Sequence, residues 1–327
     1  LMQLRRNGWI AAIVLVSFAN ANAAKPQAAR KPETVRFATE DNLLLTGDLT
    51  FPDIDKGKRA PIVILLHMYR SDRSAYTPLR PHLLKKGFIV LAIDLRGHGD
   101  SVGPKEMGLA QRVADQDKRL FAVMDRDVAA AYLYLAENHA DVIDPSRFAL
   151  VGASVGCSVA LDYAATDRSV DAVVCLTPGT NYLGIDSEDD ARKYGERAAL
   201  FVASDPEREA AETLGKLIET AEVLIAPGKP DDRMAWHGTR MFGEVKGIED
   251  RIATFLAEAV GGPPDAPVAA SVNSDIFHAG DSSNIKRISP SNLRWFSSAE
   301  EAQARGLRAP RSKGSANDKA EPFPQQP

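Results

Sequence analysis

Short apolar runs alternate with longer stretches of helical periodicity along most of the chain. The runs lack the apolar–polar alternation of a half-exposed strand, so we expect strands that are buried on both faces. After an opening hairpin of residues 35–41 and 43–51, the expected strands are residues 61–67, 88–95, 147–154, 171–179, 198–205 and 222–228. The expected helices are residues 78–87, 119–138, a stretch from residue 155 onward, and an amphipathic closing helix at 247–260.

This order predicts an α/β fold with a mostly parallel central sheet flanked by helices, because a helix between two strands makes a right-handed parallel crossover. The series occupies residues 34–260, which we expect to form one domain. The Gly-, Pro- and Ala-rich segment 261–271 interrupts the pattern and is typical of a linker. A small module is expected at 272–313, and the polar, Pro-rich tail at 314–327 is expected to be disordered.

The N-terminal segment has the three parts of a secretory signal peptide. Arg5 and Arg6 precede the apolar stretch 9–18, and the small-residue sequence ANANAA follows it. We expect cleavage after Ala23, which makes residues 1–23 the signal peptide and 24–33 a tether. The alternative is an uncleaved membrane anchor, but the apolar stretch is short against the ~20 residues that a span needs. The sequence therefore predicts a secreted or periplasmic protein without a stable membrane span after cleavage.

Composition narrows the expected partners. The 327 residues carry a formal charge of −4, and charges of both signs are interspersed. No basic stripe is present, so nucleic acid is not an expected partner. Cys157 lies in the stretch after residue 155 and Cys175 lies in an apolar run, which favours buried free thiols. Export would permit a disulfide between them, and the sequence leaves that pairing open.

The sequence GASVG joins an expected strand to an expected helix. Ser154 is its central residue, and Gly152 and Gly156 flank it. Gly-x-Ser-x-Gly at such a junction lifts a serine hydroxyl to the carboxyl end of the sheet, where a nucleophile is needed. The amide of Val155 then points toward a substrate from the start of the helix. The alternative is a tight turn that needs small residues, and the strand-to-helix context favours a nucleophile.

A serine nucleophile needs a base and an acid. In this kind of fold they follow the serine in the order acid, then histidine. Only His237 and His278 follow Ser154, and His278 lies beyond the expected linker, so His237 is the predicted base; the alternative is a surface-loop histidine. Asp205 and Glu207 are both candidates for the acid, because both follow the strand 198–205. Either could instead compensate the dipole of a helix N-terminus.

The expected oxyanion hole combines the amide of Val155 with one from the loop after strand 61–67. The amide of Tyr69 is the first choice and that of Met68 the second. His67 is expected to pack and hydrogen bond beneath this loop. The turn DLRGHGDS at 94–101 also carries tempting side chains, but we expect them to form a structural network near the site entrance.

Together these motifs resemble the α/β-hydrolase superfamily over about residues 34–260, since LLHMYRSDRSAY, AIDLRGHGDS, GASVG, ASDPERE and AWHGTRMF occur in its order. The chain looks most like the dienelactone-hydrolase-like and small serine-esterase branches, although Ser154 stands where dienelactone hydrolase carries Cys. Aligned with such relatives, Glu207 falls where they usually carry an acidic Asp. The resemblance therefore favours Glu207 over Asp205, and both stay candidates.

The resemblance implies a serine hydrolase that cleaves carboxylic esters through an acyl-enzyme, with a small-molecule ester as substrate and no cofactor or metal. The alternatives are a peptidase or amidase on the same site, or a catalytically inactive binding protein of this fold. Only residues 177–196 stand where lipase-like enzymes carry a larger helical cap. An open site follows, which disfavours a deep acyl-chain tunnel and fits short or bulky esters.

The C-terminal module resembles a different family, the small zinc-binding module of Ada-type DNA-repair proteins. That family holds its metal through thiolates. Ser282, Pro310 and Lys313 stand at or near the positions of those cysteines, so we expect no zinc site. The module is expected to keep only a hydrophobic fold and to contact a protein partner, cover part of the hydrolase, or pack inertly. The residues of that hydrophobic fold are Ile276, Phe277, Ile288, Leu293, Trp295 and Phe296.

Overall fold

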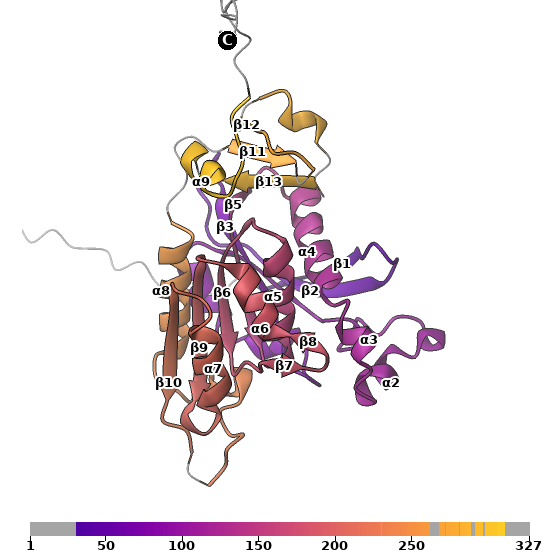
Figure 1. Cartoon of the computed structure of the whole chain (residues 1–327). Coiled ribbons are helices and arrows are strands. Elements are labelled where there is room, and N and C mark those ends of the chain that lie inside the picture. Colours follow the sequence, from indigo (N-terminus) through magenta and orange to yellow (C-terminus); the bar gives the residue numbers. More distant parts are fainter. Residues whose placement is uncertain are drawn as a thin grey trace, which may run out of the picture.

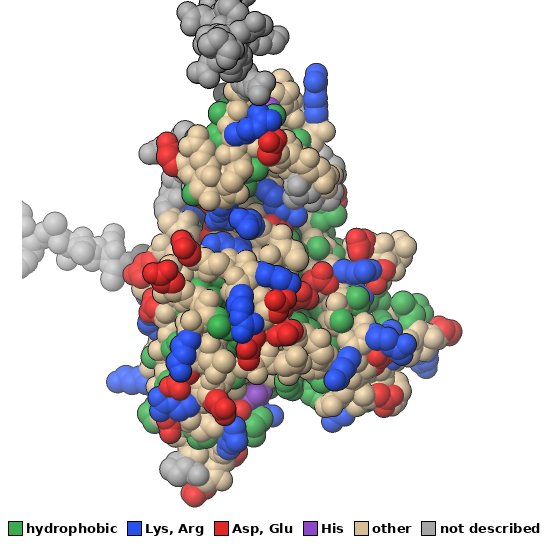
Figure 2. Space-filling view, viewed as in Figure 1, with side chains coloured by type: hydrophobic (Ala, Val, Ile, Leu, Met, Phe, Trp, Pro, Cys, Tyr) green, Lys and Arg blue, Asp and Glu red, His purple; other side chains and the backbone are tan. Residues whose placement is uncertain are grey.

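The computed structural model describes residues 31–310, except residues 230, 262–267, 272, 281, 289–291 and 297. The expected signal peptide, most of the expected tether and the expected tail lie outside these residues. Among the helices that are described, none has the length and apolar character needed to cross a bilayer. Charged side chains of both signs are scattered over the face of the molecule shown in Figure 2.

An eight-stranded sheet forms the centre of the large domain, in the order β1-β2-β4-β3-β5-β6-β9-β10 (Figure 1). The expected opening hairpin is β1 (Glu33–Ala38) and β2 (Leu44–Thr50), which pair antiparallel, and β2 pairs antiparallel with β4. All other neighbours are parallel, which confirms the predicted fold class. These strands are β3 (Ala60–Leu66), β4 (Ile89–Ile93), β5 (Ile143–Ala153), β6 (Val170–Leu176), β9 (Ala198–Ser204) and β10 (Ala221–Ala226).

Strand β3 shows why the apolar runs are unbroken. Successive strand residues point to opposite faces of a sheet. Ile64 and Leu66 join the core on one face, whereas Val63 and Leu65 join the core on the other. All four side chains are fully buried. Because helices cover both faces, a polar residue at any of these positions would lose its hydration without gaining a partner.

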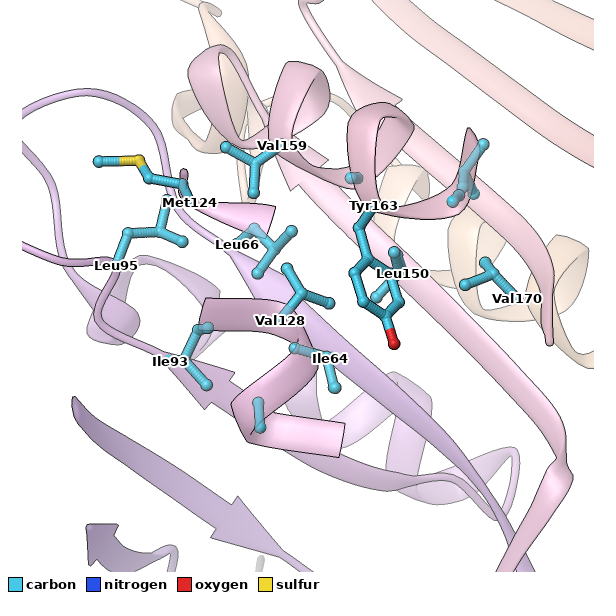
Figure 3. Close-up of a cluster of buried hydrophobic side chains, with 14 of the residues drawn as sticks. Ile64, Leu66, Ile93, Leu95, Met124, Val128, Leu150, Val159, Tyr163 and Val170 are labelled. Atoms are coloured by element: carbon cyan, nitrogen blue, oxygen red, sulfur yellow. The ribbon is translucent and has the colours of Figure 1, made fainter. Parts of the chain in front are cut away.

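The helices divide between the two faces of the sheet. Helices α1 (Arg80–Lys85) and α8 (Ile248–Ala259) pack on one face. Figure 3 shows the core on the other face, where Val128 of α4 and Val159 of α5 meet Ile64 and Leu150 of the sheet. The helices on this second face are α2 (Leu109–Ala114), α3 (Lys118–Phe121), α4 (Asp125–Asn138), α5 (Val155–Thr166), α6 (Ser187–Tyr194) and α7 (Arg208–Gly215).

Some element boundaries differ from the sequence-based expectation. The single helix expected at 119–138 is two helices, α3 and α4, and the restart at Asp125 places the buried Asp127 carboxylate on Arg96. Helix α2 was not expected. Neither were α6 and the small hairpin of β7 (Asn181–Tyr182) and β8 (Ile185–Asp186), which occupy the short segment between β6 and β9. Strand β1 begins at Glu33, one residue inside the expected tether.

The C-terminal module is a three-stranded antiparallel sheet in the order β12-β11-β13, followed by a short helix. Its core consists of Val268, Ala270, Phe277, Phe296 and Ala302. Residues 268–271 were expected to belong to the linker, and they form β11 because both neighbouring strands pair with them. The other elements are β12 (Phe277–Ala279), β13 (Leu293–Phe296) and α9 (Ala299–Ala304).

The module rests on the large domain at the end of the sheet where β3 and β5 begin (Figure 1). Arg294 Nε lies 2.8 Å from Asp167 Oδ1, and Arg305 Nη2 lies 3.4 Å from Asp171 Oδ1. Burial raises the pKa of Asp171 to about 7. The loops that follow the parallel strands lie at the opposite end of the sheet, so the module covers the large domain away from those loops.

Candidate active site

Ser154 sits on a sharp turn between β5 and α5. Its backbone has φ 52° and ψ −115°, a conformation that costs free energy and is typical of functional sites. Both flanking positions require glycine, because backbone atoms of other residues lie too close to leave room for a side chain. A Cβ on Gly152 would lie 2.1 Å from the carbonyl oxygen of Gly156, and a Cβ on Gly156 would lie 2.2 Å from that of Leu66. This is the geometry of a nucleophile elbow.

His237 meets Glu207 and not Asp205. The Nδ1 atom of His237 lies 2.8 Å from Oε1 of Glu207, and the two side chains are only 17% and 9% exposed. Since a carboxylate only accepts hydrogen bonds, Nδ1 carries the proton and Nε2 stays free to accept one. Asp205 is 57% exposed and pairs with Arg208 at 2.9 Å. Of the two acid candidates, the structure therefore brings only Glu207 to the histidine.

The chain holds both partners of this pair through neighbouring strand ends. Glu207 ends a 3₁₀ turn (Asp205–Glu207) that directly follows β9, and Ser204 Oγ lies 3.5 Å from its other carboxylate oxygen. Thr177 directly follows β6, and its hydroxyl accepts a 2.9 Å hydrogen bond from the amide of Gly238, the residue after His237. Thr177 is a positioning residue that the sequence analysis missed. The available signal was its place near the end of the expected strand 171–179, and that place does not reveal its partner.

Ser154, Glu207 and His237 line one cavity of about 470 Å³. The cavity is bounded by the segment that follows β6, by the start of α7 and by the loop that carries Arg233. Ser154 itself is only 3% exposed. The structure thus gathers the predicted nucleophile, base and acid at the carboxyl end of the sheet, although they lie far apart in sequence.

The three amides predicted for the oxyanion hole lie on the two segments expected to carry them. Val155 is the first residue of α5, where an amide has no partner within the helix. Met68 and Tyr69 follow β3, and no described residue accepts a hydrogen bond from either backbone amide. The Tyr69 hydroxyl donates to the carbonyl oxygen of Val113 at 3.1 Å, which anchors this loop.

His67 packs beneath the loop, as predicted. Its Nδ1 lies 2.8 Å from the carbonyl oxygen of Met68, and its Nε2 accepts a 3.1 Å hydrogen bond from the amide of Leu95. Complete burial lowers the pKa of His67 to about 3, so the ring is neutral at physiological pH. The His98 ring packs edge-on against the His67 ring, with the two ring centroids 4.9 Å apart. Neither histidine lines the cavity beside Ser154.

The turn at 94–101 forms a charged network, also as predicted. Asp94 accepts hydrogen bonds from the amides of Arg73 and Asp100 and pairs with the Arg73 guanidinium. Arg96 pairs with the buried Asp127. These contacts fix the two loops relative to each other, and none of these side chains reaches the cavity. The network is therefore structural support for the site.

Cys157 and Cys175 are both free and fully buried. The Cys157 thiol lies 3.3 Å from the carbonyl oxygens of Gly152 and Leu176, directly beneath the turn that carries Ser154. Burial raises the pKa of the Cys157 thiol well above its usual range. A protonated, inaccessible thiol is a packing group, so the expectation of buried free thiols is confirmed.

The fold has counterparts among solved structures. The esterase Pf2001 of Pyrococcus furiosus superposes with a TM-score of 0.53 and 22% identity, covering 71% of this chain and 93% of that one. A dienelactone hydrolase from Anabaena variabilis superposes with a TM-score of 0.52 and 18% identity, covering 70% of this chain and 97% of that one. The esterase domain of a Rhodothermus marinus protein superposes with a TM-score of 0.52 and 16% identity, covering 71% of this chain and 100% of that one. At these identities the likeness concerns the fold alone.

Sequence comparison places the chain more narrowly. A search of curated proteins returned no match. The model of one α/β-hydrolase family, described as serine aminopeptidase, S33, matches residues 57–225. The match covers more than half of the chain and includes Ser154 and Glu207, while His237 lies beyond its end. With an eight-stranded hydrolase sheet, a nucleophile elbow and this match, the chain belongs to the serine aminopeptidase S33 family of the α/β-hydrolase superfamily.

Proposed function

We propose that this protein is an exported serine hydrolase that cleaves carboxylic esters through an acyl-enzyme. The observation that carries the proposal is the 2.8 Å contact between His237 and Glu207 in the same cavity as Ser154. A carboxylate at Nδ1 fixes the tautomer in which Nε2 can take the serine proton. Ser154 is then the nucleophile, His237 the general base and Glu207 the acid that orients it.

The reaction follows from these assignments. Ser154 Oγ attacks the carbonyl carbon of the ester while His237 Nε2 takes its proton. The developing oxyanion accepts hydrogen bonds from the amide of Val155 and from one amide of the loop after β3. That second donor is Tyr69, and Met68 is the alternative. The imidazolium returns its proton to the leaving alcohol, and a water molecule that His237 deprotonates then releases the acid from Ser154. Glu207 stays ionised and stabilises the imidazolium in both steps.

Covalent labelling tests the nucleophile directly. A fluorophosphonate reacts quickly only with an activated serine, so we expect a single adduct that mass mapping places on Ser154. The Ser154→Ala variant should fold normally, take no label and lose hydrolysis of 4-nitrophenyl acetate by at least about 10³-fold. Folded protein without an adduct would refute catalysis and favour the alternative of an inactive binding protein.

Amide hydrolysis is the second candidate, because the matching family is described as a serine aminopeptidase. The same triad serves either bond, since fold and site do not fix the leaving group. Rates on 4-nitrophenyl acetate and 4-nitroacetanilide, and on alanine esters and anilides, separate the two. Ester hydrolysis without measurable turnover of either anilide supports the proposal. Comparable kcat/KM on an anilide would instead identify an amidase or peptidase.

Export and the appended module complete the proposal. The signal-like segment 1–23 supports secretion or a periplasmic location, and N-terminal sequencing of exported protein should begin at Ala24. An intact N-terminus in the membrane fraction would identify an anchor. The C-terminal module, which resembles a degenerate Ada-type domain, serves as a packing unit on the hydrolase. Its ion pairs from Arg294 and Arg305 to the large domain support this role.

A further inference from the structure

The cavity beside Ser154 has an unusual lining for a small-molecule site. Its volume of about 470 Å³ lies in the ordinary range of roughly 300–1,000 Å³. Such sites are lined mainly by hydrophobic and aromatic side chains. Here every lining residue except Pro178, Gly179 and Ala210 has a side chain that can hydrogen bond. A long acyl chain would therefore bury little of its surface against apolar groups.

The neutral groups of the lining both donate and accept hydrogen bonds. Thr180 comes from the segment between β6 and β7, Asn181 is the first residue of β7, and Thr213 comes from α7. Tyr182 adds a half-buried ring with a hydroxyl group. A substrate hydroxyl is itself a donor and an acceptor, so it satisfies such groups in pairs. A hydrocarbon in the same place would leave them desolvated without partners.

The charges of the lining disfavour an anionic substrate. Among the described residues that line the cavity, three are glutamates, and Arg233 is the one with a guanidinium or ammonium group. Glu207 is engaged by His237, and Glu188 pairs with Arg192 at 3.1 Å. Even so, an added carboxylate or phosphate would approach more negative than positive groups. The electrostatics favour a neutral group rich in hydroxyls.

The site is also open, because only α6 and the β7–β8 hairpin stand between β6 and β9. A ring can enter without displacing a large cap. We propose that the substrates are esters of polyhydroxylated alcohols, of the class of O-acylated sugars, whose hydroxyl groups bind Thr180, Asn181 and Thr213. This inference rests on the proposed function. The ester C–O bond breaks, the Ser154 acyl bond forms, and the sugar oxygen leaves with the proton held by His237.

A matched pair of substrates tests the inference in the full-length protein. Methyl 6-O-acetyl-α-D-glucopyranoside and (tetrahydropyran-2-yl)methyl acetate have the same ring and the same primary acetate, and only the first bears ring hydroxyls. We expect kcat/KM to favour the sugar by at least about tenfold, or roughly 1.4 kcal/mol. Asn181→Ala should shrink this preference, mainly through KM for the sugar. Asn138→Ala, an exposed change at the end of α4, should leave the preference unchanged.

Each outcome decides a specific point. Equal rates, or a preference for the ring without hydroxyls, would overturn the inference. Faster cleavage of a 4-O-acetylated methyl glucuronoside than of the matching 4-O-acetylated methyl glucoside, lost in Arg233→Gln, would show that Arg233 binds a carboxylate and would overturn the inference that the sugar is neutral. In both cases an adduct of fluorophosphonate on Ser154 would leave the proposed function standing. Absence of both the adduct and 4-nitrophenyl acetate hydrolysis would refute the function itself.

Discussion

Replacing Glu207 by Gln tests the central contact of the site. The glutamine carbonyl can still accept the proton on His237 Nδ1, so the ring should keep its place. The change removes the negative charge that stabilises the imidazolium, and it allows the amide group to donate instead, which would favour the wrong tautomer. The variant therefore alters the electrostatics of the pair at nearly constant side-chain volume.

The structure sets the size of the expected effect. The contact is short, at 2.8 Å, and the Glu207 side chain is only 9% exposed, so water screens the pair weakly. Loss of such a carboxylate in a serine triad costs about 10³- to 10⁴-fold in kcat, which is roughly 4–5.5 kcal/mol of transition-state stabilisation. We expect kcat on 4-nitrophenyl acetate and the rate of fluorophosphonate labelling to fall together, with KM nearly unchanged.

Asp205→Asn is the matched control. Asp205 lies two residues away on the same turn, but its side chain is 57% exposed and pairs with a half-exposed arginine. Exposed pairs of this kind contribute about 0–1 kcal/mol to stability, and this one does not touch His237. We expect kcat within about twofold of the wild type. Normal activity in Glu207→Gln together with a large loss in Asp205→Asn would refute the assignment.

Three further predictions concern the support of the site and the module. Thr177→Val leaves the buried Gly238 amide without an acceptor and should destabilise the fold by about 1–3 kcal/mol in urea unfolding while lowering kcat, and Thr177→Ser should restore both. Gly156→Ala places a Cβ 2.2 Å from a backbone oxygen and should abolish soluble folded protein. Gly57→Ala, with open space around its Cβ, is the control and should lower the free energy of unfolding by only about 1–2 kcal/mol in the same assay. Burial raises the pKa of Asp171 to about 7, so between about pH 4 and pH 7 the folded state keeps a proton that the unfolded state has released. The free energy of unfolding should therefore fall as pH rises through that window, and Asp171→Asn should remove up to ~4 kcal/mol of this fall. An unchanged pH profile in the variant would contradict the shift.

The sequence is sufficient for the sheet and for the order of the site residues. Short unbroken apolar runs identify the strands before their neighbours in the sheet are known. A strand–Gly-x-Ser-x-Gly–helix junction identifies Ser154. The residues alone left Asp205 and Glu207 open, because both follow β9 within three residues. The resemblance favoured Glu207, and the structure brings that side chain to His237. Thr177 was missed because its partner, Gly238, lies 61 residues away and chain order alone gives no sign of that contact.

The expected linker boundary at 271 was wrong for a related physical reason. A stretch rich in Gly, Pro and Ala predicts a linker from local composition, yet residues 268–271 form the central strand of a sheet whose other strands come later in the chain. Small residues suit that place, because Ala269 and Ala270 lie between two neighbouring strands and are almost fully buried. Tertiary pairing here overrides a composition that by itself favours irregular structure.

The placement of the module has a consequence for all of these experiments. Asp167 and Asp171, which pair with Arg294 and Arg305 of the module, lie just before and at the start of β6. Thr177, which holds the histidine loop, lies just after the end of the same strand. Residues 172–176 of β6, which pair with both β5 and β9, separate the two ends, so a change at the module junction should alter the free energy of unfolding without altering kcat/KM. Changes confined to Glu207 should do the reverse. If Asp171→Asn instead changed kcat/KM at constant stability, the two ends of β6 would be coupled, and the module would have to be treated as part of the catalytic machinery and not as a packing unit.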